Sequence, residues 1–175
     1  GDVDQDLGHY LDQEQEELGA RLAAAYLSAL RACETRGDAA EAAALLARMD
    51  SAGIDNGSSI TGRAVAARAC ARAGSWADAS AHVRQALSLI SENQAGVTTL
   101  DLNESMIACQ RVGEWGALLG LLDTFAEMGA SPGEDAIASA LHACERGGVC
   151  AFVAGVADDM QANWREWLNL PNPEE

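Results

Sequence analysis

At 175 residues the chain is long enough for one domain, and its 49% hydrophobic content suffices for a packed core. Alanine and leucine supply most of the apolar residues and aromatic residues only 5% of the chain, a balance that favours helices over strands. Eleven basic residues, all of them arginine, oppose 27 acidic ones, so the formal net charge is −16. This charge disfavours free nucleic acid as the partner, because proteins that bind phosphate backbones usually carry the opposite balance.

The chain begins with an acidic segment. Seven carboxylates crowd its first 17 residues: Asp2, Asp4, Asp6, Asp12, Glu14, Glu16 and Glu17. The first three are spaced like the opening of a calcium loop, but Gly8 comes one residue late and Gln13 occupies the closing position. We therefore expect a solvated acidic arm over residues 1–22, partly helical from near Leu11, that could order against a basic partner. The arm also lacks the basic start and apolar run of a signal peptide, so we expect a soluble chain.

An alanine-cysteine pair then recurs four times, and a glycine follows each cysteine after four residues. The cysteines are Cys33, Cys70, Cys109 and Cys144, and the glycines are Gly37, Gly74, Gly113 and Gly148. A glycine at that place ends a helix by adopting the left-handed backbone conformation that other residues resist. The segments after the glycines return to helical spacing. Each unit is therefore predicted to be a helix, a tight turn and a second helix.

The period near 35 residues predicts a helical-repeat domain over residues 23–163, because a lone helix pair must stack on its copies to bury its apolar face. Asp38 and Glu41 fit a capping box, and Ser131 fits the N-cap of the last unit. The predicted helix pairs are 24–36 with 38–52, 60–73 with 75–91, 99–112 with 114–128, and 134–146 with 149–163.

These residues resemble the pentatricopeptide repeat family. The first unit carries the resemblance in Tyr26, Gly37, Glu41-Ala42, Met49 and Gly53-Ile54. The second unit departs from the pattern after Ala86, and the fourth ends in "QANWREWLNL", which suggests a lengthened helix and a C-terminal cap and tail over residues 164–175. The resemblance implies an all-α fold, a right-handed α-α solenoid of about four repeats.

The family resemblance also implies binding of single-stranded RNA in organelles, one base per repeat, by a first-helix residue and the last residue of the unit. The first set maps to Ser28, Val65, Glu104 and Ser139, and the second to Ser58 and Glu134. Reading a base edge requires matched donors and acceptors. Glu104 with Glu134 instead puts two carboxylates where an anionic strand would lie, so we interpret RNA reading as degenerate or lost.

Five arginines on the first helices argue the other way: Arg31, Arg68, Arg72, Arg111 and Arg146. Arg68 and Arg72 are four residues apart and share a helix face, so the set could form a basic ridge for phosphates. Alternatively, the last three occupy final helical turns, where the helix dipole stabilises cations, or the arginines pair with acids of a neighbouring repeat. The strongly negative overall field favours the second interpretation.

Catalytic and metal-binding patterns are not recognisable. Cysteines at equivalent positions of stacked repeats lie about 10 Å apart, too far for disulfides, and are better explained as small packing residues. His142 and Cys144 are two residues apart and lie on different helix faces. We therefore expect no enzyme activity, no metal and no cofactor.

Two of the four tryptophans lie near the C-terminus, and the other two follow predicted turns. Trp164 and Trp167 form an apolar edge at helical spacing, which either caps the last repeat or anchors a protein partner. Trp76 and Trp115 follow the turn glycines and are expected to be core or turn-covering residues.

The helical repeats and the charge thus predict a non-catalytic scaffold that binds other protein subunits. The family resemblance implies an organelle, so we expect an accessory or linker subunit of a large organellar complex such as a photosystem or ribosome. The alanine-rich, lysine-free composition of the repeats suggests a plastid in preference to a mitochondrion. No stretch approaches the roughly 20 apolar residues of a membrane span, although peripheral contact with a membrane complex stays open. The alternative is an organellar RNA-binding pentatricopeptide repeat factor.

Overall fold

The computed structural model describes residues 2–54 and 56–147, and regular structure in this part is entirely helical. The all-helical class predicted from composition is therefore confirmed for the described residues. The α-helices are α1 (Asp2–Arg36), α2 (Ala39–Ser51), α3 (Asn56–Arg72), α4 (Trp76–Glu92), α5 (Thr99–Val112), α6 (Trp115–Glu127) and α7 (Glu134–Gly147). A short 3-10 turn, η1 (Gln94–Gly96), lies between α4 and α5.

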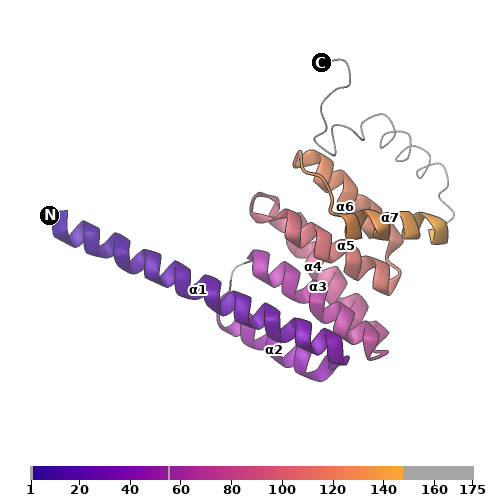
Figure 1. Ribbon diagram of the computed structural model, residues 1–175, viewed down its shortest axis with the longest axis horizontal. Helices are drawn as coiled ribbons and strands as arrows, with labels where there is room; N and C mark the ends of the chain where they lie inside the picture. Colours follow the sequence, from indigo (N-terminus) through magenta and orange to yellow (C-terminus); the bar gives the residue numbers. More distant parts are fainter. Residues whose placement is uncertain (1, 55, 148–175) are drawn as a thin grey trace, which may run out of the picture.

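The helices pack as successive pairs (Figure 1). α1 contacts α3, α3 contacts α5 and α5 contacts α7, so the first helices of the pairs lie side by side in chain order. Each second helix packs against its own first helix and the next one: α2 against α1 and α3, α4 against α3 and α5, and α6 against α5 and α7. The N-terminal half of α1 projects away from this stack (Figure 1).

The observed helices match the predicted pairs closely, with three differences. α1 begins at Asp2 rather than near Leu11 or residue 24, so the acidic arm and the first repeat helix are one continuous helix of 35 residues. α3 begins at Asn56, four residues earlier than predicted. The predicted helix 149–163 and the cap and tail 164–175 lie outside the described residues.

The third difference concerns the start of α7, where the prediction that Ser131 caps the helix is wrong. The helix begins at Glu134, and the Gly133 carbonyl accepts its first helical hydrogen bond, from Ile137 at 3.0 Å. The Gly133 N–H donates to Asn103 Oδ1 on α5 at 2.9 Å. A side chain from a neighbouring helix thus satisfies a backbone donor that local sequence reasoning assigned to a serine.

The turn glycines adopt the predicted conformation. Gly37, Gly74 and Gly113 have φ values of 69°, 81° and 81°, while Gly148 lies outside the described residues. The Gly113 N–H donates to the Cys109 carbonyl at 2.9 Å and so closes the end of α5. After the first turn, Asp38 Oδ1 accepts the Glu41 N–H at 3.1 Å, which is one of the two bonds of the predicted capping box.

Helix α3 is enclosed by α1, α2, α4 and α5, and its small side chains make this possible. Ala64, Ala66, Ala67 and Ala69 are fully buried. A Cβ placed on Gly62 would lie 3.2 Å from Met49 Cε and 3.4 Å from Leu30 Cδ1. The high alanine content thus allows neighbouring helices to approach α3 closely.

The left-handed glycines can be tested by a matched pair of substitutions. Gly113→Ala should lower the free energy of unfolding by about 1 kcal/mol, because alanine resists the positive φ. Gly120→Ala, at an exposed position within α6 where an added Cβ meets no atom within 4 Å, should raise it by about 0.5–1 kcal/mol. Urea denaturation followed by circular dichroism measures both, and equal effects of the same sign would contradict the turn assignment.

Candidate functional site

The centre of the candidate site is Arg68, a buried guanidinium on α3. Its side chain is 8% exposed and pairs with carboxylates from both neighbouring first helices. Nε and Nη2 donate to the two carboxylate oxygens of Glu34 on α1, at 2.8 and 3.0 Å. Nη1 donates to Glu104 Oε2 on α5 at 2.7 Å and to the Glu104 carbonyl at 3.3 Å. Arg68 therefore joins α1 to α5 through α3.

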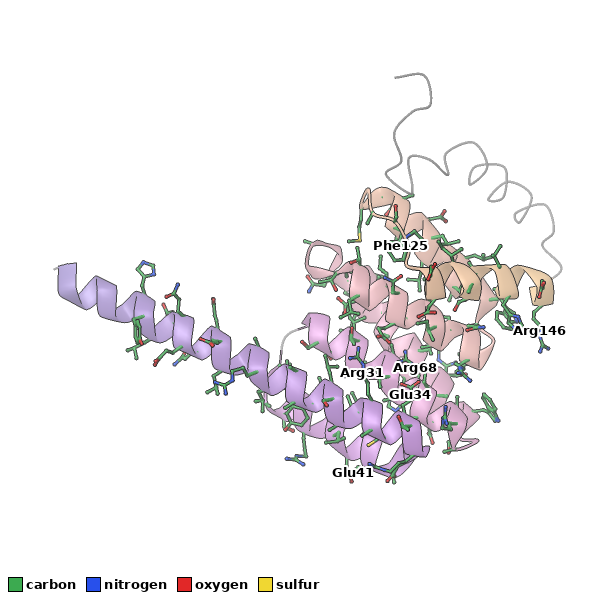
Figure 2. All side chains as sticks on the ribbon, in the orientation of Figure 1. Arg31, Glu34, Glu41, Arg68, Phe125 and Arg146 are labelled. Atoms are coloured by element: carbon green, nitrogen blue, oxygen red, sulfur yellow. The ribbon has the colours of Figure 1, made fainter. Side chains whose placement is uncertain are left out.

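Arg31 completes this arrangement from α1, because its Nη2 donates to Glu104 Oε1 at 3.1 Å. Figure 2 shows Arg31, Glu34 and Arg68 together where these helices meet. We call the four residues Arg31, Glu34, Arg68 and Glu104 the Arg68 network. Two guanidiniums and two carboxylates give it no net charge.

The network keeps Arg68 charged. Burial by itself would lower the pKa of the Arg68 guanidinium, but the hydrogen bonds and charges of Glu34 and Glu104 raise that pKa above its ordinary value. Arg68 is therefore protonated wherever the protein is folded. A charged group in this position is tolerated because both of its partners are held in contact with it.

Of the four first-helix residues predicted to read bases, two are inaccessible. Val65 is fully buried among apolar side chains of α1 and α2, and Ser139 is 3% exposed. Ser139 Oγ lies 2.7 Å from the Asp135 carbonyl oxygen and 3.1 Å from Gln110 Oε1 on α5. Neither can belong to an exposed binding face, which corrects the prediction for these two positions. Glu104 is occupied by the Arg68 network, and only Ser28 is exposed.

The structure divides the predicted arginine ridge into two groups. Arg31 and Arg68 pair with acids of neighbouring helices, as the alternative interpretation predicted. Arg72, Arg111 and Arg146 are exposed in the last turns of α3, α5 and α7, and Figure 2 shows Arg146 at the far end of α7. The five arginines therefore do not form one continuous basic surface.

A pocket of about 230 Å³ lies beside the Arg68 network. It is lined by Glu34, Arg68, Ala71, Arg72, Trp76 and Arg111. Trp76 is 57% exposed, and a Cβ placed on Gly74 would meet no atom within 4 Å, so the expectation of a core or turn-covering residue is wrong at this position. Trp115, at the equivalent place, does cover its turn, because its ring lies 3.8 Å from a Cβ placed on Gly113.

Sequence reasoning missed two sets of polar residues. Glu34 follows the repeated alanine-cysteine pair directly, and the equivalent position on α5 is Gln110, which also reaches the next first helix. The second set surrounds Asp101, which is 2% exposed. Its Oδ1 accepts from Thr61 Oγ1 at 2.6 Å, and its Oδ2 accepts from the Thr98 N–H at 2.9 Å. The spacing of Thr98 and Asp101 is a readable capping-box signal.

The cysteines of the described repeats are packing residues. Cys33, Cys70 and Cys109 are free thiols and buried. Burial raises the pKa of all three thiols, that of Cys109 to about 12. A thiol that stays protonated is a poor nucleophile and a poor metal ligand. Within residues 2–54 and 56–147 there is no group of three or more histidine, cysteine, aspartate or glutamate side chains that could hold a metal ion.

Comparison with family models and with curated proteins finds no match for this chain. Among the helices of the described residues, none is both long and apolar enough to cross a membrane. Trp164 and Trp167, the predicted end anchors, lie outside the described residues. In the described residues, the candidate site consists of ion pairs and hydrogen bonds between helices, together with the arginine-lined pocket.

The importance of the Arg68 network can be measured by replacing its centre. Arg68→Met keeps an unbranched apolar stem of similar helix propensity but removes the guanidinium. It leaves Glu34 without its partner, so it should lower the free energy of unfolding by about 2–4 kcal/mol. Arg72→Met, one turn further along α3 and exposed, is the matched control and should change it by less than about 0.5 kcal/mol. Equal losses in the two variants, measured by urea denaturation, would contradict the account.

The burial of Cys109 predicts slow alkylation. At pH 8 the reaction of Cys109 with iodoacetamide should be about 100-fold or more slower in the folded protein than in denaturant, because so little thiolate forms. Peptide mapping by mass spectrometry assigns the modification to each cysteine. Equal rates in both states would mean that the thiol is accessible and its pKa ordinary.

Proposed function

We propose that the chain is a short right-handed α-α solenoid of about four pentatricopeptide-like repeats that serves as a non-catalytic scaffold. Three left-handed turn glycines at equivalent positions and the side-by-side first helices support the repeat assignment. The fourth repeat would be completed by residues 149–163. In this proposal the protein is an accessory or linker subunit of a large organellar complex, of photosystem or ribosome type, in a plastid in preference to a mitochondrion.

One observation carries the scaffold proposal: three of the four first-helix positions that would read RNA, Val65, Glu104 and Ser139, are occupied by contacts within the protein. Arg31 and Arg68 are neutralised by Glu34 and Glu104, so they contribute no net positive charge for a phosphate backbone. Val65 is buried and has no polar group to offer a base. A helical stack whose polar first-helix residues pair with one another offers few polar groups to RNA. Such a stack is better suited to binding other proteins.

Two parts of the chain remain for binding such partners. The first is the acidic half of α1, which projects from the stack (Figure 1). The second is the C-terminal segment, where Trp164 and Trp167 would anchor a partner subunit, since tryptophans are frequent energetic centres of protein interfaces.

RNA binding remains the second candidate because of a specific observation. Arg72 and Arg111 are exposed beside the indole of Trp76, and guanidiniums next to an aromatic ring are a common arrangement for binding single strands. The strongly negative charge of the chain opposes this function.

Fluorescence anisotropy with labelled single-stranded RNA of mixed sequence separates the two candidates. At low salt the native protein should show no saturable binding, because the field of the molecule repels phosphates. Saturable binding that is lost in Arg72→Glu/Arg111→Glu, and retained in the matched control Arg48→Glu/Arg84→Glu, would refute the scaffold proposal and establish the RNA-binding alternative.

Sedimentation of the tagged protein from organelle lysate tests the scaffold proposal in its native setting. The protein should travel with a large complex both with and without ribonuclease, and Trp164→Ala/Trp167→Ala should release it. Release by ribonuclease would show that association depends on RNA. Sedimentation at the top of the gradient in every sample would contradict the proposal of a subunit.

A further inference from the structure

The pocket beside the Arg68 network presents two cations that the described chain leaves without acidic partners. Within residues 2–54 and 56–147, Arg72 and Arg111 form no ion pair. Arg72 Nη1 contacts only a backbone carbonyl, that of Thr35, at 3.5 Å. The acid in the pocket wall, Glu34, is already bound in a bidentate manner by Arg68. The pocket is therefore locally positive in an otherwise acidic molecule.

The chemistry of this pocket defines its ligand. Two guanidiniums from neighbouring helices fit a ligand with at least two carboxylates. Trp76, which forms part of the wall and is 57% exposed, offers an aromatic surface for an apolar group next to those carboxylates. An acidic helix that also carries large apolar side chains has this combination.

The projecting half of α1 is such a helix. Residues 9–22 are exposed along their whole length. Glu14 and Glu17 are three residues apart, so their carboxylates lie on the same face of the helix. Tyr10 and Leu18 lie four residues before and four residues after Glu14 on that face, and they are 60% and 66% exposed.

A molecule cannot insert its own arm into its own pocket. Glu17 precedes Glu34, which lines the pocket, by 17 residues of a continuous helix, or about 26 Å at about 1.5 Å per residue. Figure 1 shows the arm leaving the stack at the end of α1 opposite to the turn between α1 and α2. Any contact between arm and pocket must therefore join two molecules.

We propose that the acidic arm of one copy binds in the pocket formed by Arg72, Trp76 and Arg111 of a second copy. The two surfaces are different parts of the molecule, so the interface is heterologous and each bound copy still offers a free arm or a free pocket. Copies of the chain then associate head to tail.

The net charge of −16 sets the conditions for this association. At physiological salt, charges further apart than about 8 Å are screened, so contacts at the arm and the pocket outweigh the repulsion between the rest of the two molecules. Because exposed ion pairs are individually weak, the association is reversible and weakens as salt is added at high ionic strength.

Sedimentation velocity of the full, ribonuclease-treated protein over a range of concentrations tests the proposal. The native protein should sediment faster as concentration rises. Arg72→Glu/Arg111→Glu should weaken association at least tenfold, and so should Glu14→Arg/Glu17→Arg. The matched controls Arg48→Glu/Arg84→Glu and Glu92→Arg/Glu127→Arg make the same changes in net charge at other exposed sites and should associate like the native protein. Circular dichroism checks that all variants fold.

Mixing the two interface variants gives the decisive result. Each variant alone pairs like charges at the interface, but in the mixture the acidic arm of one meets the native pocket of the other, and the arginine arm meets the glutamate pocket. Association should therefore return in the mixture. A native protein that stays monomeric at every concentration, association that survives both variants, or a mixture that stays monomeric would each overturn the proposal.

Discussion

The arrangement of the first helices depends on burying one guanidinium. Arg68 is enclosed on the central helix, and a buried charge is tolerated only if it is paired and its donors are satisfied. Those partners come from two different helices, Glu34 on α1 and Glu104 on α5. The relative positions of three helices are therefore constrained by the geometry of one side chain, in addition to the small residues that let α3 pack closely.

This constraint also determines which surfaces are left for binding. The polar residues of the first-helix seams are used within the molecule, through the Arg68 network and through the contact between Ser139 and Gln110. Within the part of the chain that the structure describes, two exposed surfaces of opposite charge are left for a partner: the projecting acidic half of α1 and the arginines at the C-terminal ends of the first helices. A stack whose seam residues are paired and whose remaining charged surfaces are exposed is consistent with the proposed linking role between molecules.

The sequence was sufficient to predict where most of the described helices lie and where the turns inside the repeats fall, because those signals are local. Gly37, Gly74 and Gly113 mark the turns through a backbone conformation that other residues resist. The sequence could not predict that Val65 is buried and Glu104 paired at equivalent repeat positions, because this depends on which helix packs against each seam. Nor could it predict that Asn103 would replace Ser131 at the start of α7, since that contact spans 30 residues.

A double-mutant cycle between Glu34→Gln and Glu104→Gln, repeated in the Arg68→Met background, tests most directly whether Arg68 couples α1 to α5. Either single variant leaves Arg68 one carboxylate, whereas the double variant leaves a buried cation unpaired. The account predicts that the double variant loses at least about 1 kcal/mol more unfolding free energy than the sum of the single losses, and that this excess disappears in Arg68→Met. Additive losses in both backgrounds would contradict the coupling.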